Sequence, residues 1–152
     1  MSKLSDIDKR LIRELAKDGR ISWVQLGEKV NLSASAAQRR AEALVRAGVI
    51  KKFSIELDAE KLGQTITAII SVNVERQKTG VAEKFRSKVM SYPEVENFVK
   101  LSGSVDYQFV VRAADIKALS HFIDNKLLVL EGVIDANSAI VLEEYSGAAA
   151  YF

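Results

Sequence analysis

The sequence of 152 residues contains no cysteine, one histidine and one proline. Without cysteine the chain can form no disulfide, no thiolate nucleophile and no cysteine-ligated zinc site. A lone histidine, His121, cannot supply a metal site built from several histidines. No apolar run reaches the length that spans a membrane, and we recognise no secretory leader. We therefore expect a cytoplasmic protein with no membrane partner, no metal site and no cofactor.

Neither charge sign dominates the chain, whose formal net charge is +2, but the charges are unevenly distributed. Residues 1–52 contain 12 Lys or Arg against 6 Asp or Glu, a net charge of +6. Residues 53–152 contain 10 against 14, a net charge of −4. A basic segment followed by an acidic body indicates a polyanionic partner for the first part of the chain. The length suits one or two small domains.

The basic segment opens with two predicted helices. Ser5 and Asp8 have the spacing of a capping box at the start of the first helix, with aspartate in place of the usual glutamate. Ser22 can cap a second, short helix over residues 23–30, because its hydroxyl can accept a hydrogen bond from a free backbone N–H. Gly27 is unfavourable inside a helix, and it therefore indicates a close approach of two helices.

A third helix follows the tight turn Asn31-Leu32. It is rich in alanine, begins at Ser33 and ends at Gly48, which suits the left-handed position after a helix. Two short helices joined by three or four residues, the second of which starts on a serine, indicate a helix-turn-helix. The third helix would then be its recognition helix.

The exposed face of the third helix carries the side chains that can read bases. Its apolar residues fall at helical spacing on one stripe, Ala37, Ala41, Leu44 and Val45. Gln38 and Arg39 lie off this stripe, among small residues that let the backbone approach a groove. Glutamine can bond adenine bidentately and arginine can bond guanine. The alternative is an ordinary amphipathic surface helix with a solvated Gln-Arg pair.

Other polar side chains near this helix suit the DNA backbone. Ser33 and Ser35 lie at its N-terminus, where free N–H groups and the helix dipole favour a phosphate. Arg40 is a candidate DNA contact, but it lies at the edge of the packed stripe and could equally pair with an acidic neighbour. Lys51 and Lys52 could reach phosphates, although lysine on an exposed strand edge serves solubility as often.

A hinge is predicted between two domains. Apolar and polar residues alternate over Val49–Leu57, which favours a strand. No linker rich in proline or serine follows, so the connection is expected to be short and structured. We therefore predict a DNA-binding domain over 1–50, a hinge strand and linker over 51–63, and a second domain over 64–152.

The second domain shows the order β-α-β-β-α-β. Strands alternate over 66–74, 95–101, 107–113 and 133–142, and helical spacing marks the segments that begin at Val81 and Ile116. Ser102-Gly103-Ser104 is the turn of a hairpin between the middle strands. This order is that of a ferredoxin-like fold, with both helices on one face of the sheet.

The other face of the predicted sheet is too apolar to stay fully solvated. It is expected to carry Thr67, Ile69, Ser71, Phe98, Val110 and Arg112. A second copy of the chain is the simplest cover for such a face, so we expect a homodimer through this sheet.

Short motifs recur along nearly the whole chain, namely Leu4-Ser5-Asp6-Ile7-Asp8, Asp18-Gly19-Arg20, Leu32-Ser33, Arg40, Leu44, Gly48-Val49-Ile50, Leu57-Asp58, Lys61-Leu62-Gly63, Pro93-Glu94-Val95, Gly103 and Asp106-Tyr107. In their order and spacing together, these motifs resemble the Lrp/AsnC (feast/famine) family of transcription regulators. The resemblance implies an α+β protein with a winged-helix-like helix-turn-helix domain, a hinge strand and a ferredoxin-like domain. That second domain binds amino acids and assembles dimers, often into octamers. Ser5 and Ser104-Val105 depart from the family pattern, the latter in the loop expected to touch the effector.

The resemblance also implies an effector site at the hairpin turn. An amino acid needs an acceptor for its ammonium and N–H or hydroxyl donors for its carboxylate. Such groups gather at the turn, on Ser102, Gly103, Ser104, Asp106 and Tyr107. Ser138 and Ala139 on the last strand match further positions near the family's effector pocket. The alternative is a hairpin turn that merely uses the usual serine, glycine and aspartate.

Three classes of function follow from these patterns. The first is a regulator that binds double-stranded DNA and responds to a small effector, expected to be an amino acid. The second is a nucleoid-type architectural protein that bends DNA without an effector. The third is a small enzyme, because ferredoxin-like folds can host catalysis. The lone histidine, the absent cysteine and the lack of paired carboxylates on one element argue against the enzyme.

Overall fold

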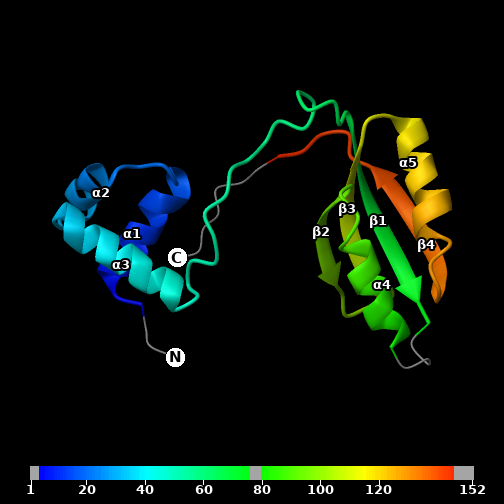
Figure 1. Ribbon diagram of the computed structural model, residues 1–152, viewed down its shortest axis with the longest axis horizontal. Coiled ribbons are helices and arrows are strands. Elements are labelled where there is room, and N and C mark those ends of the chain that lie inside the picture. Colours follow the sequence, from blue (N-terminus) through cyan, green and yellow to red (C-terminus); the bar gives the residue numbers. More distant parts are fainter. Residues whose placement is uncertain (1–3, 76–79, 146–152) are drawn as a thin grey trace. The chain divides into compact units, whose positions relative to one another are not determined.

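The computed structural model describes residues 4–75 and 80–145, which divide by their contacts into two compact units (Figure 1). Unit 1 comprises the described residues up to Glu56, and unit 2 those from Leu57 onward. The division falls inside the segment predicted as a hinge. Among the described residues, no helix is long and apolar enough to cross a membrane.

Unit 1 consists of three helices, each starting at a serine cap. They are α1 (Asp6–Lys17), α2 (Trp23–Val30) and α3 (Ala34–Arg46). The side chains of Ser5, Ser22 and Ser33 each accept a hydrogen bond from a backbone N–H in the first turn, as predicted. The helices bury one small core, formed by Leu11, Leu15, Leu26, Val30, Ala37, Ala41 and Leu44. This packing fixes α3 against the other two helices.

The turn between α2 and α3 is tight because α2 carries a glycine there. Asn31 adopts the left-handed conformation, with φ of 59°, and the Leu32 N–H donates to the Gly27 carbonyl. A Cβ atom on Gly27 would lie 2.6 Å from the Leu32 carbonyl oxygen. The predicted close approach is therefore confirmed, and it places the start of α3 directly against α2.

The alternation over Val49–Leu57 predicts a hinge strand, which stays a prediction because these residues form no strand within the single chain. Residues 51–57 form no strand, and their side chains are exposed on both sides of the backbone. A strand requires a partner whose N–H and C=O groups complete the ladder. No described segment of this chain pairs with residues 51–57, so such a strand would need a partner from another chain.

Unit 2 has the predicted α+β ferredoxin-like order, with one addition. Its elements are β1 (Ile66–Val74), α4 (Val81–Val89), β2 (Val95–Lys100), β3 (Tyr107–Ala113), α5 (Ile116–Phe122), a π-helical segment η1 (Ile123–Leu127) and β4 (Val133–Ile140). The strands form one antiparallel sheet in the order β2-β3-β1-β4. Both α-helices lie on the same face of this sheet (Figure 1).

The core of unit 2 lies between the sheet and its helices. Alternate residues of β1 and β3 point into it, and the burial patterns of both strands show the expected period of two. Phe85 of α4 and Phe122 of α5 pack on this face, with Phe109 beneath them. The sheet is therefore a rigid support for the turn that joins β2 and β3.

One residue predicted on the open face of the sheet lies on the helix-covered face instead. Phe98 stacks on Phe109, with ring centroids 5.7 Å apart, and contacts Phe85 at 6.4 Å. The reason is a bulge in β2, where the register shifts between Val95 and Asn97. The extra residue reverses the alternation after it. Phe98 is therefore part of the core.

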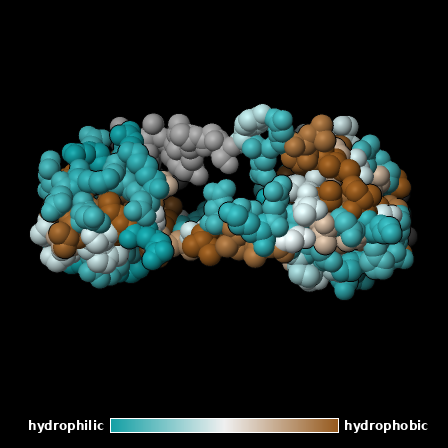
Figure 2. Space-filling model, turned by 90° about the horizontal axis from the view of Figure 1, so that it is seen from above, coloured by the Kyte–Doolittle hydropathy of each residue, from teal (hydrophilic) through white to brown (hydrophobic). Residues whose placement is uncertain are grey.

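The open face has an apolar row between two polar rows. Across the strands, Val110, Ile69 and Ala139 lie side by side. On one side the Gln108 side chain donates to the Ser71 hydroxyl at 3.2 Å. On the other, Arg112 donates to Thr67 at 2.9 Å and pairs with Glu96 at 2.6 Å. Figure 2 shows that hydrophobic and hydrophilic side chains are mixed on the visible surface of unit 2.

Candidate nucleic-acid interface and ligand pocket

The N-terminus of α3 is open to an anion. Ser33 caps it by accepting from the Ala36 N–H at 3.3 Å, and its hydroxyl lies 3.3 Å from that of Ser35. Both serines are exposed, and the first turn of α3 contains no acidic residue. The helix dipole and the hydroxyl groups therefore favour a phosphate at this point.

Gln38 and Arg39 both lie on the exposed side of α3. Gln38 donates to Glu42 at 3.0 Å, and Glu42 also approaches Arg46 at 3.8 Å. Arg39 forms no hydrogen bond or ion pair with any residue that the structure describes. Its guanidinium can bind a base without breaking an existing contact, whereas the Gln38 amide must first leave Glu42.

Arg40 differs from its neighbour because it is engaged within unit 1. Its guanidinium lies 2.6 Å from an Asp8 carboxylate oxygen and donates to the Ser5 hydroxyl at 3.3 Å. Asp8 in turn accepts from the backbone N–H and the hydroxyl of Ser5. Of the two roles that the sequence left open for Arg40, the geometry favours the ion pair that holds α3 to α1.

This ion pair makes the stability of unit 1 depend on pH. Partial burial acts to raise the pKa of Asp8, but hydrogen bonds from Ser5 and Arg40 outweigh it and lower the pKa below its ordinary 3.8. A carboxyl with a lowered folded-state pKa contributes stability above its unfolded pKa, and the contribution disappears as the pH falls through the folded pKa. Thermal unfolding between pH 2.5 and 6 should show Asp8→Asn less stable than wild type near pH 6, with the difference vanishing at low pH.

The control for this measurement lies in the same helix. The Asp6 side chain is 96% exposed and has only a 3.4 Å ion pair with Lys9. Asp6→Asn should therefore change the stability of unit 1 much less than Asp8→Asn does. A constant difference between Asp8→Asn and wild type across the whole pH range would show that the Asp8 charge does not act through this pair.

Lys51 and Lys52 follow α3 in the segment without secondary structure. Both are exposed, and neither has an ion pair with a described residue. Contact with phosphate and a role in solubility are thus both compatible with their position. They remain predicted rather than established DNA contacts.

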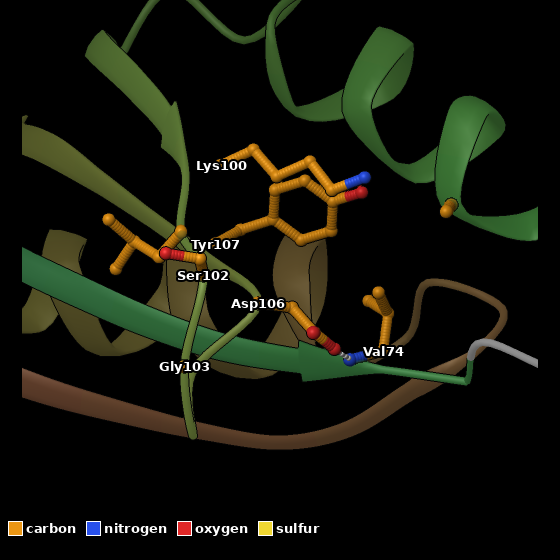
Figure 3. A pocket seen from close by; sticks show the side chains of 8 residues that line it. Val74, Lys100, Ser102, Gly103, Asp106 and Tyr107 are labelled. Carbon is orange, nitrogen blue, oxygen red and sulfur yellow. Dashed lines mark hydrogen bonds between the residues drawn. The ribbon is translucent and has the colours of Figure 1, made fainter.

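A cavity of about 370 Å³ lies beside the β2–β3 turn of unit 2 (Figure 3). Four of the predicted effector residues line it, Ser102, Gly103, Asp106 and Tyr107. The remaining lining residues are Val74, Ala82, Lys100 and Leu101, which the sequence analysis did not propose. The register of the β2–β3 hairpin pairs Lys100 with Tyr107, so a correct strand alignment could have pointed to Lys100.

Asp106 is held more firmly than a turn residue usually is. It is 6% exposed, and its carboxylate accepts from the Val74 N–H at 3.0 Å (Figure 3). Its own N–H donates to the Asn73 side chain at 3.0 Å. Asp106 therefore fixes the turn to the end of β1, in addition to lining the cavity. Any contact with an effector ammonium would share a carboxylate that is already bonded.

The other predicted effector residues lie elsewhere on unit 2. Ser104 faces a second, more open hollow of about 580 Å³, which Asp106 also lines together with Asn73, Glu75, Ile134 and Asp135. Ser138 and Ala139 pair with Ile70 and Ile69 of β1 and do not line the cavity beside the turn. The structure therefore brings together four of the seven predicted effector residues.

Known proteins resemble both units of the chain. Residues 4–51 match the model of a winged helix-turn-helix DNA-binding domain, and residues 67–150 match that of the Lrp/AsnC ligand binding domain. The Bkd operon transcriptional regulator of Pseudomonas aeruginosa is 32% identical, over 94% of each chain. The leucine-responsive regulatory protein of Klebsiella pneumoniae is 33% identical, over 93% of this chain and 86% of its own.

Solved structures agree with these sequence matches. A transcriptional regulator of Neisseria meningitidis in complex with L-Met is 33% identical, covers 95% of this chain and 94% of its own, and has a TM-score of 0.90. Bacillus subtilis LrpC is 28% identical, covers 95% of this chain and 99% of its own, and has a TM-score of 0.83. Because both units match along nearly their full length, this chain belongs to the Lrp/AsnC family of DNA-binding transcriptional regulators.

Proposed function

We propose that this protein is a sequence-specific transcriptional regulator whose DNA affinity or assembly responds to an amino acid. The observation that carries the DNA part is the uncommitted guanidinium of Arg39 on the exposed side of α3. An arginine held on a rigid helix can donate two hydrogen bonds to the O6 and N7 atoms of guanine. The family consists of transcriptional regulators, which excludes the enzyme alternative.

The remaining DNA contacts divide by the chemistry of their side chains. Gln38 is proposed to read a base edge beside Arg39, after exchanging its bond to Glu42 for one to adenine. Ser33 and Ser35 are proposed to bind a phosphate at the start of α3. Lys51 and Lys52 would add sequence-independent affinity through phosphates, which weakens as salt concentration rises. Access to chromosomal DNA would place the protein in the cytoplasm.

The effector is proposed to bind in the cavity beside the β2–β3 turn. A relative of similar fold has been solved as a complex with L-Met, which supports an amino acid as the class of ligand. The Ser102 hydroxyl and the backbone at Gly103 offer donors for an α-carboxylate, and Asp106 offers an acceptor for an α-ammonium. Ser104 would take part only through the second hollow. Ser138 and Ala139 would take part only in a site completed by a neighbouring subunit.

Assembly is proposed to occur through the open face of unit 2. The apolar row of Val110, Ile69 and Ala139 suits a two-fold interface, in which the same surface is used by both subunits. Dimers built in this way could associate further into the octamers that the family resemblance implies. The domain limits 1–50, 51–63 and 64–152 remain part of this proposal.

Replacing Arg39 with alanine tests the DNA part of the proposal. On a site selected from random DNA, the change should cost about 1–3 kcal/mol and relax the base preference at one position. Gel-shift titrations at one fixed salt concentration would measure both effects. Arg46→Ala is a matched control from the same helix. Arg46 already approaches Glu42, and it lies at the C-terminal end of α3.

Two outcomes would contradict parts of this proposal. An equal loss on every sequence would make Arg39 a phosphate contact and remove its role in specificity. Titrations repeated with each common amino acid should reveal at least one that changes the DNA affinity. DNA binding that no amino acid alters would favour the effector-independent architectural protein.

A further inference from the structure

The ring of Tyr107 is buried, but its hydroxyl group is not among the buried polar atoms that lack a partner. Tyr107 is 5% exposed, and its ring packs between Phe85 at 5.5 Å and Phe98 at 5.2 Å. It lines the cavity beside the turn and forms no hydrogen bond with a described residue. The hydroxyl is therefore accessible at the cavity wall, where it can donate a hydrogen bond to a ligand.

Lys100 lies beside this hydroxyl as the strand pairing requires. It is directly opposite Tyr107 in the β2–β3 register, so both side chains project from the same face of the sheet. Figure 3 shows them extending in the same direction across the cavity. Lys100 has no ion pair with a described residue, and it is the one cationic side chain among the described residues that line the cavity.

We infer that Lys100 and Tyr107 select a dicarboxylic amino acid as the effector, by binding its side-chain carboxylate. This inference rests on the proposed effector site and specifies its ligand. A carboxylate accepts several hydrogen bonds, which matches an ammonium and a phenolic hydroxyl that have no partner among the described residues. The α-carboxylate has its own donors at the turn, on Ser102 and Gly103. The side-chain carboxylate of the ligand is therefore the group that Lys100 and Tyr107 would bind.

The rest of the cavity fits the stem of such a ligand. Val74, Ala82 and Leu101 supply apolar wall between the turn and the two donors. The Asp106 carboxylate is directed toward the Val74 N–H and the end of β1 (Figure 3), on the side proposed for the ammonium. A purely apolar side chain would displace water from the Tyr107 hydroxyl without replacing its hydrogen bond, which weakens binding.

Isothermal titration of the full chain with four amino acids tests the inference. L-glutamate and L-aspartate carry the second carboxylate, L-glutamine replaces it with a neutral acceptor, and L-leucine lacks it. Wild type should bind one dicarboxylic amino acid at least about tenfold more tightly than L-leucine. Lys100→Met should reduce that affinity by about tenfold and leave L-leucine nearly unchanged. Tyr107→Phe, which keeps the packed ring, should reduce it by roughly fivefold.

Lys117→Met is the control, because Lys117 is an exposed lysine of α5 that does not line the cavity. It should bind all four amino acids as wild type does. Tighter binding of L-leucine than of both dicarboxylic amino acids would overturn the inference and leave the effector proposal intact. Equal losses for all ligands in Lys100→Met would also overturn it, because Lys100 would then bind the α-carboxylate. Binding of no amino acid at all would instead remove the effector proposal itself.

Discussion

Replacing Ile69 with aspartate is expected to convert the proposed dimer of this chain into a monomer. Ile69 is the centre of the apolar row on the open face of unit 2, between Val110 and Ala139. In a two-fold interface both subunits would bury the new carboxylate. An uncompensated buried charge costs about 3–5 kcal/mol, so the dimer dissociation constant should rise at least about a hundredfold. Sedimentation velocity at a concentration where wild type is dimeric would show the change.

The matched control is another apolar side chain on unit 2. Val129 is 66% exposed in the loop between η1 and β4 and does not belong to the open face. Val129→Asp should leave the sedimentation coefficient of the dimer unchanged. If Ile69→Asp also remained dimeric, the dimer interface would have to lie on another surface.

Replacing Gly27 with alanine is expected to destabilise unit 1 strongly, although alanine is the better helix former. Helix propensity alone would favour the change by about 1 kcal/mol. The new Cβ, however, would lie 2.6 Å from the Leu32 carbonyl oxygen and 3.2 Å from the Ala34 nitrogen. Both neighbours are backbone atoms of the turn into α3, so neither can rotate away. Overpacking of this kind costs about 1–3 kcal/mol or more, and it would displace the start of the recognition helix.

Unfolding of unit 1 can be followed by the fluorescence of Trp23, the single tryptophan of the chain. Gly27→Ala should lower the midpoint of the urea transition and weaken DNA binding. Gly19→Ala is the control, because a Cβ there would meet only ordinary contacts, the nearest at 3.8 Å. An unchanged midpoint in Gly27→Ala would mean that the turn can relax, and that Gly27 is not required for the approach of α2 to α3.

The features that the sequence predicted correctly depend on near neighbours. A serine cap needs only the N–H two or three residues further on, so Ser5, Ser22 and Ser33 were recognisable from spacing. The strands of unit 2 were recognisable because a covered sheet buries every second residue of β1 and β3. The hinge strand stays a prediction, because the alternating residues 51–57 pair with no described segment of this chain.

The features that the sequence could not predict depend on pairing between distant segments. Nothing in the sequence from Val95 to Phe98 reveals that the register shifts there, since a bulge is defined by the opposite strand. The contact of Arg40 with Asp8 joins residues 32 positions apart, and helical periodicity alone left its role open. For the same reason Lys100 was missed, although it lies across the hairpin from the predicted residue Tyr107.

The pairing of Asp106 with the end of β1 has a consequence for how the sheet reaches a single alignment. Because side chains alternate with a period of two, sliding β1 past β3 by two residues would keep every apolar side chain on the covered face. Hydrophobic burial therefore discriminates only weakly between such misaligned sheets. The Asp106 carboxylate accepts from Val74 and its N–H donates to Asn73, and a slip would leave these buried groups without partners. Each lost partner costs about 1–3 kcal/mol, so this polar pair selects the native alignment among those that burial alone leaves nearly equal.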